Sequence, residues 1–349
     1  MKFYGRKEEI AELRYGMRLS AQHSHITVIT GQRNVGKTRL VMEALWNDST
    51  GNIPFVYFLA AGANIDEPFS CEWLRKVILE VLGEDIGSHE RLVDAFRQAV
   101  ILSERINYTL VLDEIHQMLQ QGGDFFAEMQ DVWDVYRYKT HLNLVLVGGS
   151  VRTSLKGVSD GGIHLRPFAK DEVGVILSEY NPEYAEEDLQ MLYEITGGNP
   201  RYIELFLEHG NIKKEDMLRD FFNSQIFIEH GYSSLMAKFG RKWRDYFAVL
   251  DEITKGNTSE IQIVDTLVGR RHKTRKGAWN IIGNLADHEI IGRKAISEGE
   301  GNVPQNIEYE ITDNLLAFWF RYAKPYMLEL EIGRGDLVYK VLRPKFFTK

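Results

Sequence analysis

HITVITGQRNVGKTRLVMEALW, residues 25–46, is the stretch that decides the fold of this 349-residue chain. A β-branched apolar run ends at a glycine and an amphipathic pattern follows, which predicts a buried strand, a turn and a helix. The turn, GQRNVGKT at 31–38, fits G-x-x-x-x-G-K-[ST] without a mismatch. Gly31 and Gly36 allow the backbone to curl so that its N–H groups, and the N-terminus of the helix, face one anion. The stretch therefore predicts a phosphate-binding loop.

Each residue type in this loop has an expected task. Lys37 is a compact cation that reaches the β- and γ-phosphates of a nucleotide, and the Thr38 hydroxyl coordinates Mg²⁺. The expected ligands are ATP or ADP with Mg²⁺. The alternative is a glycine-rich turn that binds nothing, although the flanking strand and helix argue against it. The expected nucleotide-binding residues of the loop are Gly31, Gln32, Arg33, Asn34, Val35, Gly36, Lys37, Thr38 and Arg39.

A pair of acids follows a second apolar run, TLVLDEIH at 109–116. An aspartate that ends a buried strand near the loop holds Mg²⁺ through water, which is the role expected of Asp113. The adjacent Glu114 is placed to orient, or accept a proton from, an attacking water. The alternative is that two acids simply begin a surface loop. His116 and Gln117 either face the γ-phosphate or are ordinary polar surface residues.

Apolar strands alternate with helical patterns over residues 1–168, which predicts an α/β core with a parallel sheet covered on both faces. One of these strands is LNLVLV at 142–147, and Ser150 follows it. If that strand lies between the loop strand and the Asp113 strand, Ser150 reaches the γ-phosphate; otherwise Ser150 caps a helix. Residues 169–238 read as helical throughout, and 239–349 as a third part.

Composition bounds the class of protein. With 44% apolar and 26% charged residues the chain is an ordinary globular one, and a single cysteine, Cys71, excludes a disulfide framework or a cysteine-based zinc site. No apolar stretch approaches the ~20 residues of a membrane span, and the charged N-terminus is unlike a signal peptide. We therefore expect a soluble, cytoplasmic protein without membrane contact.

The net charge of −8 hides a split between the two parts of the chain. Residues 238–349 carry a net +4 and residues 1–237 a net −12. The basic part shows three helical patterns, the second ending at Gly269 and the third over 273–287, followed by a hairpin pattern, which is the order of a winged helix-turn-helix. Its five clustered cations favour either DNA or a protein contact. These cations are Arg270, Arg271, Lys273, Arg275 and Lys276.

A further aromatic cluster lies near the end of this domain. It is either a base-stacking platform or, as the spacing favours, part of a buried helix. Its residues are Phe318, Trp319, Phe320 and Tyr322.

Taken in order, several motifs resemble the archaeal-ATPase group of the AAA+ and STAND P-loop NTPases, which also occurs in bacteria. They are FYGRKEEIAELR (3–14), GQRNVGKT (31–38), TLVLDEIH (109–116), LRPF (165–168), GGNPRYIELF (197–206) and ITDNLLAFWFRY (311–322). The resemblance covers nearly the whole chain and implies an ATPase core, a helical lid and a C-terminal winged helix.

Further site residues are implied only by this resemblance. Tyr4, Gly5 and Arg6 would lie near the adenine or its ribose, and Pro200 would pack on the base from the lid. Arg201 would sense phosphate from a helix start, or is an ordinary surface arginine.

The chain departs from the group's pattern between Ser150 and LRPF. This stretch is short and lacks the usual arginine, so Arg152, Arg166 or an arginine from a partner or a second copy would have to replace it. Because such an arginine is worth orders of magnitude in rate, we expect hydrolysis to be slow or partner-dependent.

The prediction is therefore Mg²⁺-dependent ATP binding and hydrolysis that drives a switch or remodelling through the winged helix. The alternative is an ATP-gated DNA-binding regulator in which nucleotide use is slow or structural.

Overall fold

The computed structural model divides into two compact units, Lys2–Arg166 and a second formed by Met1 with Pro167–Lys349. This boundary lies close to residue 168, where the alternation of strands and helices ends in the sequence. The structure describes residues 1–46, 53–59, 70–115, 125–149, 161–208, 210, 212–298 and 304–347.

A five-stranded parallel sheet in the order β2-β3-β4-β1-β5 forms the first unit, which confirms the predicted α/β core. Every residue of β1, β3 and β4 is buried, which explains why these runs are apolar throughout instead of alternating. Because β4 lies between β1 and β3, the ends of the loop strand and the Asp113 strand are one strand apart. The strands are β1 (His25–Gly31), β2 (Phe55–Leu59), β3 (Tyr108–Asp113), β4 (Leu142–Val147) and β5 (Gly161–Leu165).

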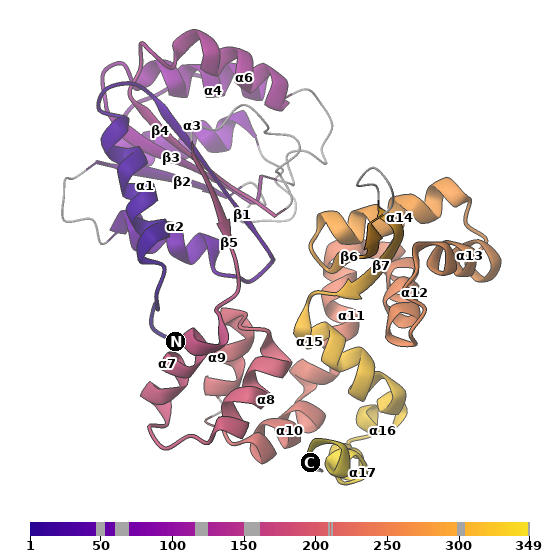
Figure 1. The fold of residues 1–349 in the computed structure, drawn as a ribbon. Helices are drawn as coiled ribbons and strands as arrows, with labels where there is room; N and C mark the ends of the chain where they lie inside the picture. Colours follow the sequence, from indigo (N-terminus) through magenta and orange to yellow (C-terminus); the bar gives the residue numbers. More distant parts are fainter. Residues whose placement is uncertain are drawn as a thin grey trace. The chain divides into compact units, whose positions relative to one another are not determined.

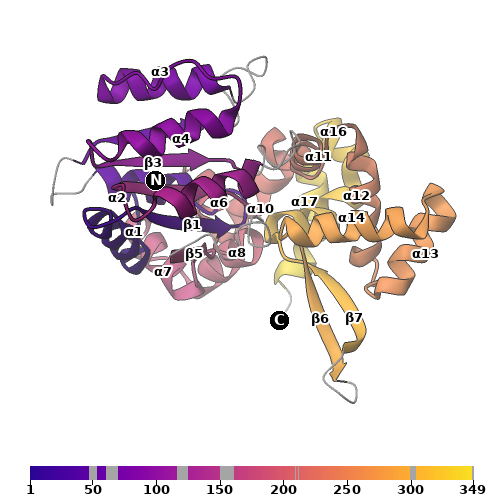
Figure 2. The same cartoon turned by 90° about the horizontal axis from the view of Figure 1, so that it is seen from above.

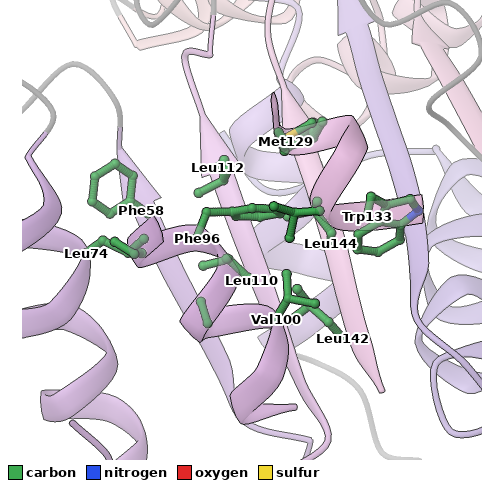
Figure 3. Packing of buried hydrophobic residues seen from close by; sticks show 14 of the residues in the cluster. Phe58, Leu74, Phe96, Val100, Leu110, Leu112, Met129, Trp133, Leu142 and Leu144 are labelled. Atoms are coloured by element: carbon green, nitrogen blue, oxygen red, sulfur yellow. The ribbon is translucent and has the colours of Figure 1, made fainter. Parts of the chain in front are cut away.

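Helices cover both faces of this sheet (Figure 1). On one face, Phe96 and Trp133 pack with Leu110 and Leu144 of the central strands (Figure 3). On the other face, Val111 of β3 packs in a cluster with residues of α1 and α2. Alternate residues of one strand thus serve opposite cores. The face with Phe96 and Trp133 is covered by α3 (Cys71–Leu82), α4 (Leu92–Leu102) and α6 (Phe125–Tyr136). The face with Val111 is covered by α1 (Lys7–Leu19) and α2 (Lys37–Trp46).

The second unit begins with helices alone, as the sequence predicts for the stretch up to residue 238. Its α9 starts at Pro200, where a missing N–H costs no hydrogen bond. These helices are α7 (Lys170–Tyr180), α8 (Glu186–Thr196), α9 (Pro200–Glu208), α10 (Lys214–Asn223) and α11 (Gln225–Phe239).

Three helices and an antiparallel hairpin follow, and Figure 2 shows the hairpin projecting from the helices. Ser259, just before the second helix, forms an isolated antiparallel bridge with Glu308 of the hairpin. This is the winged helix-turn-helix arrangement that the sequence predicts. Its elements are α12 (Trp243–Thr254), α13 (Glu260–Arg271), α14 (Arg275–Asp287), β6 (Ile291–Glu298) and β7 (Pro304–Ile311).

The predicted end of α13 at Gly269 is wrong. The helix continues to Arg271, and His272 stops it by adopting a left-handed backbone with φ of 52°. The Thr274 hydroxyl then caps α14 by accepting the N–H of Gly277 at 3.0 Å. Glycine inside a helix lowers its stability but keeps its hydrogen bonds, so it does not by itself end a helix.

The chain ends in α15 (Asn314–Phe318), a π-helical turn over Trp319–Ala323, α16 (Met327–Glu331) and α17 (Gly335–Phe347). Phe318, Trp319 and Phe320 are buried, and the Trp319 indole donates to the carbonyl of Ile228 at 2.9 Å. The buried-helix interpretation is therefore confirmed for these three residues, while Tyr322 is half-buried.

Candidate nucleotide-binding site

The loop between β1 and α2 adopts the backbone that its glycines permit. Gly31, Asn34 and Gly36 have φ values of 139°, 65° and 95°. A Cβ on Gly31 would lie 2.2 Å from the carbonyl oxygen of Leu165, its partner on β5, whereas a Cβ on Gly36 would meet nothing within 4 Å. The sheet itself therefore requires Gly31, while the space beside Gly36 is open.

Some side chains of the loop pack against the protein, and others are exposed to solvent. Val35 is buried and fixes the loop to the α2 face of the sheet. The Lys37 ammonium folds back over the loop and donates to the carbonyls of Gly31 at 2.9 Å and Gln32 at 2.7 Å. The exposed side chains of the loop are Arg33, Asn34, Thr38 and Arg39, and Gln32 is half-buried.

Thr38 and Asp113 meet although 75 residues separate them. The Thr38 hydroxyl donates to Oδ2 of Asp113 at 2.6 Å, and the Tyr57 phenol donates to the same oxygen. The other carboxylate oxygen accepts the N–H of Glu114 at 2.7 Å. Asp113 is 1% exposed, so the carboxylate is desolvated and held by these three donors.

Glu114 has an uncommon backbone for a residue other than glycine, with φ of 57°. The next residue, Ile115, donates its N–H to the carbonyl of Val147 at the end of β4, at 3.1 Å. The chain therefore turns sharply after Asp113 while staying tied to the neighbouring strand. Strained backbone of this kind is concentrated at functional sites.

Tyr57 is the residue of this site that the sequence reasoning missed. Burial first, and then the hydrogen bond to Asp113, raise its pKa above the ordinary value, so the phenol remains a donor at neutral pH. The sequence offered only a weak signal: strand geometry places Tyr57 on the face opposite Val56 and Phe58, and in the structure that is the α2 side of the sheet.

Tyr4, Gly5 and Arg6 precede α1. Gly5 and Arg6 both have positive φ, at 62° and 59°, so the chain turns twice before the helix. The Arg6 guanidinium donates to the carbonyl of Arg166 and to Glu9 at 3.3 Å. Arg6 thus ties the first residues of this unit to its last.

Four residues singled out from the sequence lie outside the described part of the chain. They are His116, Gln117, Ser150 and Arg152. Arg166 is described and has an exposed side chain.

Pro200 and Arg201 belong to the second unit, at the first turn of α9. The Arg201 side chain is 48% exposed and pairs with Glu204 at 2.9 Å, one turn along the helix. Its backbone N–H donates to the side chain of Asn199 at 3.1 Å.

The turn formed by Gly197–Pro200, which we call the GGNP turn, is in contact with two distant segments. Gly198 accepts the N–H of Phe168 at 2.9 Å, and a Cβ on Gly198 would lie 1.9 Å from the Phe168 carbonyl oxygen. A Cβ on Gly197 would lie 2.6 Å from the side chain of Asn314. Close backbone approach therefore requires Gly198, whereas Gly197 is limited by its positive φ of 58° and by the Asn314 side chain.

A partly buried polar contact lies next to this turn. Tyr202 of α9 donates its hydroxyl to Asp313 at 2.9 Å, and Asp313 caps α15, directly after the hairpin. The His230 ring packs edge-on against Tyr202, with ring centroids 5.4 Å apart. Burial lowers the pKa of His230, so the ring is neutral at physiological pH.

The five cations of the winged helix do not all enter α14. Arg270 and Arg271 lie in the last turn of α13, and only Arg275 and Lys276 lie on α14. Four of the five carry ion pairs within the domain. The pairs are Arg270 with Glu252 at 3.1 Å, Arg271 and Lys273 with Asp245 at 4.0 and 2.7 Å, and Arg275 with Asp265 at 3.0 Å.

The described ranges also bear on metal binding and on membranes. No group of three or more His, Cys, Asp or Glu residues that could hold a metal ion is found in these ranges. None of the helices in the same ranges has the length and apolar character that a membrane span needs.

Comparison with known proteins agrees with this geometry. A family model described as an ATPase domain predominantly from Archaea matches residues 3–206. An uncharacterized protein of Methanocaldococcus jannaschii is 24% identical over 353 residues, which cover 96% of this chain and 72% of that protein.

Two solved structures share the fold at low sequence identity. A Walker-type ATPase of Pyrococcus abyssi aligns with a TM-score of 0.60 at 19% identity, covering 91% of this chain and 96% of that one. The ORC2 protein of Aeropyrum pernix, solved as ADPNP–ADP complexes, aligns with a TM-score of 0.56 at 14% identity, covering 95% and 96%. Because the family model spans more than half of the chain, this protein belongs to the family of ATPase domains found predominantly in Archaea.

Proposed function

We propose that the first unit binds ATP with Mg²⁺ and hydrolyses it. The observation that carries the proposal is the 2.6 Å contact between the Thr38 hydroxyl and Asp113. It joins the start of α2 to the end of β3 in a parallel sheet whose strand ends hold the glycine loop. Ligands bind at this edge in open α/β sheets, particularly where the strand order changes direction.

The phosphates lie against the loop in this proposal. Its backbone N–H groups and the N-terminus of α2 supply positive potential, and the open space beside Gly36 admits an anion close to the backbone. The Lys37 ammonium exchanges its carbonyl partners on the loop for phosphate oxygens. Arg33 and Arg39 add positive charge at the exposed rim of the loop.

The residues present fit Mg²⁺. This ion prefers oxygen ligands and usually keeps several waters. The Thr38 hydroxyl would coordinate it directly, and the Asp113 carboxylate, which accepts from Thr38 at 2.6 Å, would hold it through water. Bound there with nucleotide, the ion would neutralise charge on the phosphate oxygens. Few protein ligands are needed, since phosphates and water complete such a site.

Glu114 orients the attacking water in this proposal. It follows Asp113 directly, and its left-handed backbone sends the chain away from the strand at that point. A carboxylate that positions water or accepts its proton contributes roughly 10²–10⁴-fold in rate. The usual arginine of the family pattern is absent, so hydrolysis is slow, or a partner or second copy supplies the arginine.

In this proposal the second unit responds to the bound nucleotide. We assign residues 169–238 to a lid and 239–349 to the winged helix with its tail. Pro200 contacts the base and Arg201 the phosphate when the lid closes, and Tyr4, Gly5 and Arg6 lie near the adenosine. The GGNP turn supports this coupling, because it contacts Phe168 on one side and Asn314, beyond the hairpin, on the other. Nucleotide turnover would thereby switch the winged helix.

DNA contact by the five cations is the second candidate. It is supported by the exposure of Arg275 and Lys276 at the start of α14, the helix that enters the major groove in such domains. The four internal ion pairs oppose it, because each cation must leave an acid before it neutralises a phosphate. A protein partner is therefore the favoured target of the winged helix.

The test of the proposed hydrolysis is Glu114→Gln, with the exposed Glu104→Gln as matched control. We expect phosphate release to fall by about 100-fold or more while ATP affinity stays within about twofold of the parent. Glu104→Gln should leave both unchanged. If the Glu114→Gln variant released phosphate at the rate of the parent, Glu114 would have no part in the mechanism. Failure of the parent chain to bind ATP with Mg²⁺ would overturn the proposal as a whole.

A further inference from the structure

Tyr57 reaches the candidate magnesium site from outside the glycine loop. It lies on β2, the strand next to β3, and its register partner is Val111, two residues before Asp113. Its phenol donates to Oδ2 of Asp113, the oxygen that also accepts from Thr38. The two hydroxyls therefore approach one carboxylate oxygen from different elements.

The donors around Asp113 differ in how they are supported. Thr38 belongs to the first turn of α2, directly after the loop that must accept the phosphates. Glu114 donates from a strained turn. Tyr57, in contrast, is fixed within a sheet strand by hydrogen bonds to β3. All three donors are neutral, and no ion pair of Asp113 is found within the described ranges. The orientation of the carboxylate thus depends on hydrogen bonds, and of its two side-chain donors in the described ranges, Tyr57 is the one that does not belong to the helix after the glycine loop.

We propose that Tyr57 is a positioning residue that fixes the Asp113 carboxylate and thereby makes the site prefer Mg²⁺ to Ca²⁺. This inference rests on the proposed function. Mg²⁺ requires nearly ideal octahedral geometry, whereas Ca²⁺ accepts six to eight oxygens at about 2.3–2.6 Å in flexible arrangements. A carboxylate that is free to rotate serves Ca²⁺ about as well as a fixed one, but it serves Mg²⁺ less well.

The experiment compares Tyr57→Phe with Tyr108→Phe. Tyr108 lies on β3 itself, is fully buried, and donates its hydroxyl to the carbonyl of Ala99 at 2.6 Å, away from the site. Both substitutions remove one hydroxyl and one hydrogen bond and leave a ring of the same size, so both should fold with similar, modest losses of stability. ATP affinity is measured for parent and variants with EDTA, with Mg²⁺ and with Ca²⁺.

For Tyr57→Phe we expect the gain in ATP affinity from Mg²⁺ to fall about tenfold. The gain from Ca²⁺ and the affinity in EDTA should stay within about twofold of the parent, and Tyr108→Phe should match the parent in all three conditions. Equal losses in EDTA, Mg²⁺ and Ca²⁺ would reduce Tyr57 to a structural role and overturn the inference.

Failure of the inference is distinct from failure of the proposed function. If the parent gains affinity from Mg²⁺ and Tyr57→Phe gains as much, only the positioning role of Tyr57 is refuted. If the parent gains nothing from Mg²⁺, the proposed magnesium site fails and the inference with it.

Discussion

Gly31 and Gly36 are both required by the loop pattern, but the structure predicts that alanine at each fails for a different reason. The Cβ of Gly31→Ala would lie 2.2 Å from the Leu165 carbonyl oxygen, so β5 must retreat by about 1 Å from its paired strand. The Cβ of Gly36→Ala would enter open space. The first substitution should therefore damage the sheet and the second the proposed phosphate site.

The magnitudes follow from two terms. A positive φ costs a residue with a Cβ about 1–2 kcal/mol, and overpacking costs about 1–3 kcal/mol more. Gly31→Ala incurs both, so its free energy of unfolding should fall by about 2–5 kcal/mol. Gly36→Ala incurs only the first in the nucleotide-free protein. When phosphate occupies the space beside Gly36, the overpacking term applies to binding and weakens ATP affinity by about 10–100-fold.

The assay is urea unfolding of both variants without nucleotide, followed by ATP titration under conditions where each is folded. We expect Gly36→Ala to be the more stable of the two and to bind ATP poorly. Parental ATP affinity in a folded Gly36→Ala protein would refute the placement of phosphate against this part of the loop. Equal destabilisation by the two substitutions would refute the reasoning about Leu165.

Three further predictions concern the second unit. A Cβ on Gly231 would lie 2.3–2.5 Å from atoms of the Trp319 ring, so Gly231→Ala should lower the free energy of unfolding by about 1–3 kcal/mol. Gly283 of α14 has open space around it, so Gly283→Ala should raise the free energy of unfolding by up to about 1 kcal/mol. Equal effects of the two substitutions in thermal melts would contradict this packing. Burial acts to raise the pKa of Asp251, but hydrogen bonds from Lys255 and Lys324 outweigh it and lower the pKa below 3.8. The stabilisation is therefore present above that pH and lost as the pH falls below it. In unfolding curves, Asp251→Asn should be less stable than the parent at pH 7, and the difference in stability should shrink in acid. Replacing the five cations by glutamine should change the salt slope of any DNA binding by less than the roughly 0.9 per cation that free phosphate contacts give, because four of them are paired with acids. If the salt slope, measured by fluorescence anisotropy, fell by the full value of about 4.5, DNA would again be the favoured target.

The sequence was most informative where burial is complete. Strands β1, β3 and β4 are uniformly apolar because both of their faces are covered, and such runs between helical patterns leave few alternatives to a parallel sheet. The glycine loop was equally clear, because close approach at Gly31 and positive φ at Gly36 exclude most other residues. In both places one local requirement determines the residue type.

Prediction failed where several local solutions are available. Gly269 is a reasonable helix end, but His272 ends α13 in its place, because histidine is one of the residues other than glycine that adopt a left-handed backbone. Tyr57 was missed for a different reason. A tyrosine on an apolar strand is ordinary core by composition, and only the register of β2 against β3 brings its hydroxyl to Asp113.

The GGNP turn shows how a motif can be recognised without its physical reason being visible in the sequence. Gly198 tolerates no Cβ because the Phe168 backbone, just after the start of the second unit, passes directly over it, while Gly197 has a positive φ and lies against the side chain of Asn314. Three parts of the second unit therefore meet at the GGNP turn, through Phe168, the two glycines and Asn314. If nucleotide moves the lid as we propose, a displacement of Phe168 would be passed to the Gly198 backbone, since the two are packed too closely to absorb the movement, and the Asn314 side chain beside Gly197 would carry it on to the start of α15.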